Sequence, residues 1–80
     1  NAQGYNNLGV AYTRTGRYDD ARKALERSLE LDPRVSAFTN LSSLEFKAGN
    51  FQKTVEWGLE ALKQGERSHR VWGNMAAAYE

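Results

Sequence analysis

The stretch Tyr5-Asn6-Asn7-Leu8-Gly9-Val10-Ala11-Tyr12 opens a pattern that runs to Pro33 and decides the fold of this chain. Its residues Tyr5, Leu8 and Tyr12 recur at spacings of three and four, which is typical of one face of a helix. After Gly16 the same spacing returns in Tyr18, Ala21, Leu25 and Leu29. A glycine suits the left-handed position that follows a helix, so Gly16 marks a turn. The stretch therefore predicts two helices joined by a short turn.

The same pattern returns further along the chain. A shift of 33 residues places Tyr5 on Phe38 and Gly16 on Gly49, and a shift of 34 places Phe38 on Trp72. A period of about 34 residues that holds two helices is the sequence signature of a stacked helical array. We therefore expect five helices, near residues 2–15, 18–31, 34–48, 51–64 and 68–80.

The motif residues resemble the tetratricopeptide-repeat family. Its opening aromatic-x-x-Leu-Gly-x-x-Tyr corresponds to residues 5–12, its Ala-x-x-x-Phe segment to residues 21–25 with Leu25 for Phe, and its closing proline to Pro33. The third unit is only an opening helix, residues 72–79. The second unit departs from the family pattern at five positions, which are Ser42, Glu45, Thr54, Gly58 and Glu66. Trp57 either fills the space that Gly58 vacates or is exposed to a partner, and both readings stay open.

The resemblance implies an all-α fold in which antiparallel helix–turn–helix repeats stack as a right-handed α-solenoid of five helices. We expect a single domain over residues 1–80, with repeats at about 2–34 and 35–68 and a half repeat at 69–80. The chain starts at Asn1 without an initiator methionine, so we expect a fragment of a longer protein. The last helix has an uncovered apolar face, and the isolated piece is expected to form a homodimer through it, exchange helices or fray.

Composition excludes several classes of protein. The 80 residues contain no cysteine and carry a net charge of +1, which excludes a disulfide framework and gives no nucleic-acid footprint. No apolar run approaches the roughly 20 residues of a membrane span. We therefore expect no nucleic-acid and no membrane partner, and the absence of cysteine favours the cytoplasm.

The chain also lacks the residues that catalysis needs. Its one histidine, His69, stands between cations in Arg67-Ser68-His69-Arg70, which is typical of a solvated turn. Asp19 and Asp20 are adjacent and point about 100° apart on a helix, where they suit the helix dipole rather than a paired acid and base. The sequence therefore predicts no enzyme, no metal site and no cofactor.

In the family that the chain resembles, the first helices of successive units line a concave groove. The resemblance therefore implies a peptide-binding groove to which each of the three units contributes, and its residues are Asn6, Asn7, Val10, Arg14, Asn40, Ser43, Phe46, Lys47, Arg70 and Asn74. The family's clamp for two carboxylates is mostly absent, since Asn6, Val10 and Asn74 stand where Lys, Asn and Arg are required.

Asn7, Asn40 and Asn74 occupy one place in all three units and are expected to form a ladder along the groove. A carboxamide offers donors and an acceptor together, so each rung could grip one peptide group of an extended ligand. The other reading is that these residues only stabilise the repeat, and the sequence leaves both open.

The leading functional hypothesis is a protein-interaction scaffold that binds an extended peptide or partner protein in this groove. A regulatory or substrate-recruiting region of a larger enzyme or transcriptional regulator is the first alternative, and a self-association module is the second. RNA binding by helical repeats is a further reading, and the near-neutral charge argues against it.

Overall fold

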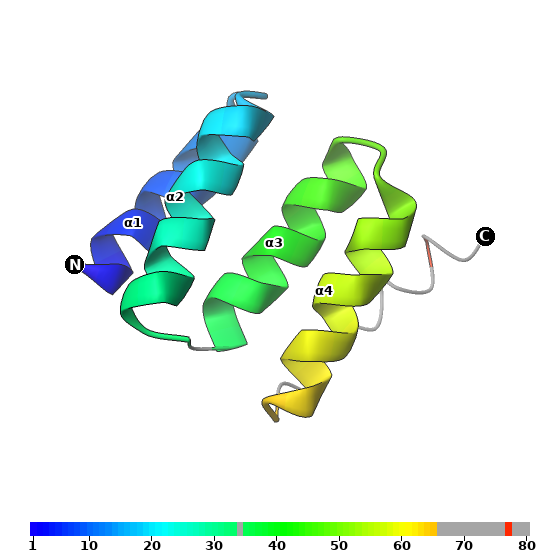
Figure 1. The fold of residues 1–80 in the computed structure, drawn as a ribbon. Coiled ribbons are helices and arrows are strands. Elements are labelled where there is room, and N and C mark those ends of the chain that lie inside the picture. Colours follow the sequence, from blue (N-terminus) through cyan, green and yellow to red (C-terminus); the bar gives the residue numbers. More distant parts are fainter. Residues whose placement is uncertain (34, 66–76, 78–80) are drawn as a thin grey trace.

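The computed structural model describes residues 1–33, 35–65 and 77 of the chain. These residues form four helices: α1 (Ala2–Arg14), α2 (Tyr18–Leu31), α3 (Val35–Lys47) and α4 (Phe51–Lys63). Each helix runs antiparallel to the one before it, and the pairs α1–α2 and α3–α4 lie side by side (Figure 1). Because every second helix reverses the chain, α1 and α3 run in the same direction. The described part of the chain thus contains two stacked helical hairpins and no strand.

The expectation of five helices is wrong: the described residues form four. The fifth was expected at residues 68–80 because a shift of 34 residues places Phe38 on Trp72, and this segment, apart from Ala77, lies outside the described residues. Spacing indicates an amphipathic pattern, but a helix this short gains most of its stability from packing against its neighbours. The pattern alone therefore could not establish a fifth helix. The homodimer was expected to form through the fifth helix, so this expectation also concerns residues 68–80, which lie outside the described residues apart from Ala77.

The turns after α1 and α3 are built alike, which confirms the role expected of the two glycines. Gly16 and Gly49 have φ angles of 79° and 86°, in the left-handed region that favours glycine. The amide that follows each glycine reaches back to the last turn of the helix: Arg17 N donates to Tyr12 O at 2.9 Å, and Asn50 N donates to Glu45 O at 2.8 Å. These bonds satisfy carbonyls that a helix end leaves unpaired, so each turn fixes the start of the next helix.

The core lies between the two hairpins. Ala21 and Leu25 of α2 pack with Leu41 and Leu44 of α3, and all four are completely buried. Trp57 of α4 packs against this cluster, and its ring lies 5.8 Å from that of Phe38 between ring centres. Of the two readings left open for Trp57, the structure therefore supports packing, and the residue is half-buried.

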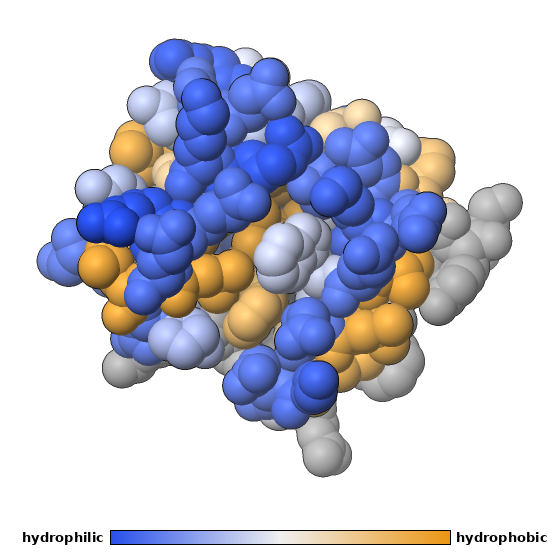
Figure 2. Space-filling view, viewed as in Figure 1, coloured by the Kyte–Doolittle hydropathy of each residue, from blue (hydrophilic) through white to orange (hydrophobic). Residues whose placement is uncertain are grey.

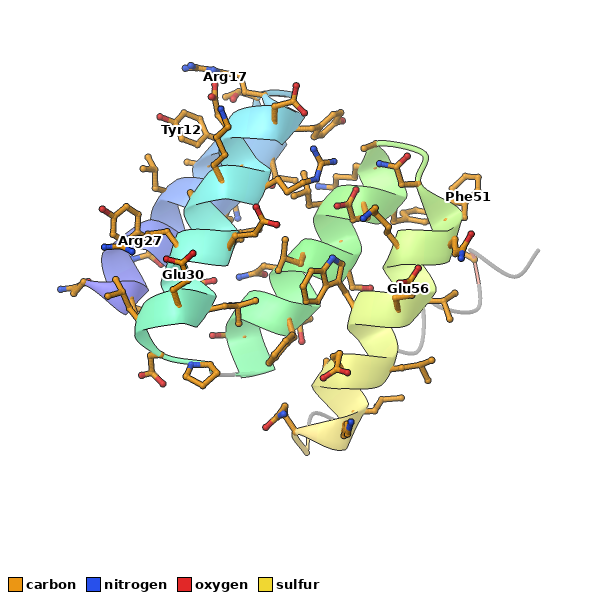
Figure 3. All side chains as sticks on the ribbon, viewed as in Figure 1. Tyr12, Arg17, Arg27, Glu30, Phe51 and Glu56 are labelled. Atoms are coloured by element: carbon orange, nitrogen blue, oxygen red, sulfur yellow. The ribbon has the colours of Figure 1, made fainter. Side chains whose placement is uncertain are left out.

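Side chains on the outer faces make local contacts. Arg17 lies over the ring of Tyr12, 4.7 Å from its centre, and Arg27 pairs with Glu30 at 2.8 Å (Figure 3). Hydrophilic residues dominate the face on which α2 lies in front of α1, with hydrophobic ones between the helices and at the edges (Figure 2). Among the described residues, the large hydrophobic side chains that are exposed are Tyr5, Leu8, Leu31, Phe51 and Leu59.

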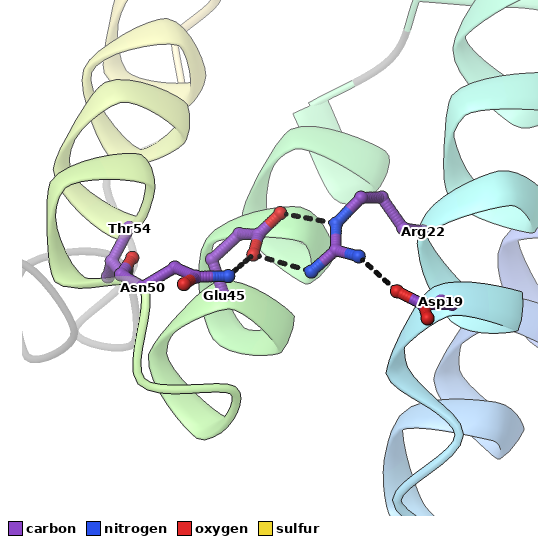
Figure 4. Close-up of polar contacts among 5 residues, drawn as sticks. All are labelled: Asp19, Arg22, Glu45, Asn50 and Thr54. Atoms are coloured by element: carbon purple, nitrogen blue, oxygen red, sulfur yellow. Dashed lines mark hydrogen bonds and ion pairs between the residues drawn. The ribbon is translucent and has the colours of Figure 1, made fainter.

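A buried ion pair joins the two hairpins. Glu45 of α3 is completely buried, and its carboxylate accepts two hydrogen bonds from Arg22 of α2, from Nε at 2.8 Å and Nη2 at 2.9 Å (Figure 4). Asn50 Nδ2 donates to the same carboxylate at 2.8 Å, and Arg22 also pairs with Asp19 at 2.9 Å. Glu45 departs from the family's tyrosine, and its pairing with the half-buried guanidinium of Arg22 explains how a carboxylate is accommodated there.

Burial alone would raise the pKa of Glu45, but the hydrogen bonds from Arg22 and Asn50 and the Arg22 charge outweigh it and hold that pKa below its ordinary value. A carboxylate with a lowered pKa stabilises the fold above its unfolded-state pKa of about 4.3, and this contribution is lost as the pH falls through the folded-state pKa. We expect the melting temperature to fall between pH 5 and pH 3, and to fall less steeply in Glu45→Gln. Thermal unfolding followed by circular dichroism checks this, and parallel pH profiles for the two proteins would contradict it.

Candidate functional site

The parallel helices α1 and α3 form the floor of a groove with a hollow at each end. The amino-end hollow, of about 320 Å³, lies where both helices begin and is lined by Asn1, Ala2, Gln3, Asn6, Ser28, Asp32, Ser36 and Ala37. The carboxyl-end hollow, of about 200 Å³, lies where both helices end and is lined by Val10, Thr13, Arg14, Asn40, Ser43 and Lys47. The lining residues of α1 recur at three- and four-residue spacing, as do those of α3, so each helix presents one continuous face to the groove.

A pair of buried carboxamides lies between the two hollows. Asn40 Nδ2 of α3 donates to Asn6 Oδ1 of α1 at 2.9 Å, and the two side chains are only 8% and 7% exposed. The bond ties the two hairpins together on the groove side, as the pair of Arg22 and Glu45 does between α2 and α3. Within the described residues, Asn6 uses only its oxygen in a side-chain hydrogen bond, so its amide nitrogen remains available as a donor at the wall of the amino-end hollow.

The structure brings together most of the residues expected at the groove. Asn6 lines the amino-end hollow, and the carboxyl-end hollow gathers five others: Val10, Arg14, Asn40, Ser43 and Lys47. Phe46 lines neither hollow and packs instead on Phe51, with 5.8 Å between ring centres. Arg70 and Asn74 lie outside the described residues.

Asn7 lies apart from the groove hollows. It is exposed, and its side-chain oxygen accepts a hydrogen bond from Gln3 Nε2 of the same helix at 3.0 Å. The neighbour of Asn40 across the helices is Asn6 and not Asn7. The ladder through Asn7, Asn40 and Asn74 therefore stays a prediction whose first rung is not aligned with Asn40 in the described residues.

Sequence reasoning did not assign any groove residue to the second helix of a unit. The structure shows that the end of α2 closes the amino-end hollow through Ser28 and Asp32. Ser28 is buried, and its Oγ donates to the carbonyl of Ala2 at 2.8 Å, which holds the last turns of α2 against the first turn of α1. The only sign of this contact in the sequence was Ser28 itself, a small polar residue on the otherwise apolar buried face of α2.

Residues 2–35 match the family model of the tetratricopeptide repeat. This match is consistent with membership of the tetratricopeptide-repeat family and covers less than half of the 80-residue chain. The matched tetratricopeptide repeat covers α1, α2 and the connection to α3, which is the part of the sequence closest to the family pattern. No curated protein matches the chain.

A tetratricopeptide repeat is in general a protein-interaction module and typically has no catalytic role. The described residues contain no group of three or more histidine, cysteine, aspartate or glutamate side chains that could hold a metal ion. In the part of the chain that the structure covers, no helix is both long and apolar enough to cross a bilayer.

Proposed function

We propose that this tetratricopeptide-repeat chain binds an extended peptide segment of a partner protein along the groove between α1 and α3. The observation that carries the proposal is the alignment of two hollows on the same two parallel helices, with the Asn6–Asn40 pair between them. Two hollows in line suit an extended peptide whose side chains enter them one after the other.

The dimensions of the groove suit a short extended segment. A helix of 13 residues such as α1 is about 20 Å long, and an extended chain advances by about 3.3 Å per residue. The groove therefore has room for about six residues of peptide. Each hollow is at or below the low end of the roughly 300–1,000 Å³ typical of small-molecule pockets, which favours single side chains over a cofactor.

The lining chemistry suits a peptide backbone. Carboxamide and hydroxyl groups from Gln3, Asn6, Thr13, Ser36 and Ser43 line the hollows, and each type can pair with a peptide N–H or C=O group. Val10 adds an apolar contact in the middle of the α1 face. Protein or peptide is thus the class of partner that the groove supports best, and the net charge of +1 favours it over nucleic acid.

Two adjacent residues of α1 offer a matched test. Val10 lines the carboxyl-end hollow, whereas Ala11 is exposed, lines neither hollow and lies about 100° round the helix. We expect Val10→Trp to fill the hollow and to weaken binding to a peptide array at least tenfold, and Ala11→Trp to leave binding unchanged. Circular dichroism verifies that both variants fold. Equal binding by Val10→Trp and the unaltered chain would contradict the proposal, as would an array on which no peptide binds.

A further inference from the structure

The charged residues are divided unequally between the two faces of the stack. Helices α2 and α4 carry carboxylates and cations together; their acidic residues are Asp19, Asp20, Glu26, Glu30, Glu56 and Glu60. The groove helices are different, because α1 contains no acidic residue and the only one in α3 is Glu45. Glu45 is completely buried and already paired with Arg22, so it contributes no negative charge to the groove.

The two cationic side chains of the groove helices line the same hollow. Arg14 of α1 and Lys47 of α3 line the carboxyl-end hollow, both are exposed, and neither forms an ion pair within the described residues. The other described lining residues, Val10, Thr13, Asn40 and Ser43, carry no charge. Among the described residues, the hollow is therefore lined by two positive charges and no carboxylate.

A cation in the last turn of a helix also offsets the helix dipole, which is a sufficient local reason for Arg14 and Lys47. Lys63 serves the same role at the end of α4, which is also a helix of 13 residues. What distinguishes Arg14 and Lys47 is that their helices end together at a hollow. Two cations that line one hollow, with no described carboxylate beside them, favour an anionic ligand group there.

We infer that the carboxyl-end hollow binds the carboxylate of an aspartate or glutamate side chain, so that the groove selects acidic extended peptides. The inference rests on the proposed function and adds a ligand class to it. The volume of about 200 Å³ accommodates one side chain. Arg14 supplies a planar guanidinium that can pair with a carboxylate through two hydrogen bonds, and Lys47 supplies a second charge.

Among the described residues, the cations of the groove helices lie only where α1 and α3 end. A bound peptide would therefore have a preferred direction or charge pattern, with its acidic residue placed beside Arg14 and Lys47. Base-edge or phosphate-backbone recognition would instead favour cations along the whole groove.

The experiment uses a fluorescein-labelled peptide, Gly-Ser-Gly-Asp-Glu-Gly-Ser, and its amide counterpart, Gly-Ser-Gly-Asn-Gln-Gly-Ser, with binding followed by anisotropy at low and moderate salt. The test variant is Arg14→Gln with Lys47→Gln, and the control is Lys23→Gln with Lys63→Gln. Both variants remove two positive charges, and all four residues are exposed. We expect the acidic peptide to bind at least tenfold more tightly than the amide peptide. The test variant should lose this preference and the control variant should keep it.

The outcomes separate the inference from the proposed function. Equal binding of the two peptides, abolished by Val10→Trp, would overturn the acidic preference while the groove proposal stands. Equal losses in the test and control variants would show unspecific attraction and would also overturn the inference. Failure of both peptides to bind, together with failure of every peptide on the array, would overturn both. Binding of single-stranded oligonucleotide with the same dependence on Arg14 and Lys47 would overturn the peptide assignment.

Discussion

Gly9→Ala is expected to destabilise the chain, although alanine favours helix over glycine. A Cβ atom at residue 9 would lie 2.5 Å from Leu25 Cγ, 2.6 Å from Leu25 Cδ2 and 3.3 Å from the carbonyl oxygen of Ala21. Leu25 cannot yield, because it is completely buried against Leu41 and Leu44. We expect α1 and α2 to be forced apart at a cost of about 2–3 kcal/mol, reduced by up to about 1 kcal/mol of helix propensity.

Gly4→Ala in the same helix is the matched control. A Cβ atom there would meet only the side chain of Asn1, with Oδ1 at 3.1 Å and Cγ at 3.9 Å, and this flexible side chain can move by a few tenths of an ångström. Gly4→Ala should therefore gain up to about 1 kcal/mol. Thermal unfolding followed by circular dichroism measures both, and about 1 kcal/mol shifts the midpoint of a domain this small by about 4–8 °C. A rise in midpoint for Gly9→Ala similar to that for Gly4→Ala would show that the close approach of α1 and α2 is not a constraint.

Arg22→Met is expected to have the larger effect on stability. The carboxylate of Glu45 is completely buried and depends on Arg22 for two of its three hydrogen bonds. Without Arg22 the charge stays buried with only Asn50 as a donor. The loss of one partner from a buried pair costs about 3–5 kcal/mol, and we expect the lower end because the Arg22 side chain is 26% exposed and water can partly replace it.

Two further variants identify the cause. Arg27→Met removes a guanidinium from the same helix, but its pair with Glu30 is exposed on both sides and should contribute nothing measurable. Arg22→Met combined with Glu45→Leu removes both charges and should recover most of the lost stability. Urea unfolding gives the free energies. If Arg22→Met is no less stable than Arg27→Met, the buried pair does not join the hairpins as described.

The sequence predicted the helices well because local signals decide where they begin and end. Residues 18–31 were expected to be helical and α2 has these bounds. Each of the other three helices ends one residue earlier than expected, and residue 34, where α3 was expected to begin, lies outside the described residues. Gly16 and Gly49 explain this accuracy, since each supplies the positive φ that ends a helix. The one error in the number of helices arose beyond Gly65, where the repeat supplies only the opening half of a third unit.

Contacts between the hairpins were harder to predict. Glu45 was recognisable as a departure from the family pattern, but its partner Arg22 lies 23 residues earlier, and nothing in the sequence pairs them. The carboxamide pair shows the same difficulty. The turn glycines repeat at 33 residues, which aligns Asn40 with Asn7, yet Asn40 donates its hydrogen bond to Asn6. One residue changes the direction of a side chain by about 100°, so the repeat period cannot decide which asparagine faces its neighbour.

The most direct test of the groove as the binding face is an amide chemical-shift map of the ¹⁵N-labelled chain, titrated with the tightest peptide from the array. The account predicts that the largest perturbations fall on Asn6, Val10, Thr13, Asn40 and Ser43, along the facing sides of α1 and α3. Exposed residues of the opposite face, such as Lys23 and Glu26 of α2 and Lys53 and Glu56 of α4, should remain unchanged. Perturbations concentrated on α2 and α4, with the α1 and α3 amides unmoved, would contradict it.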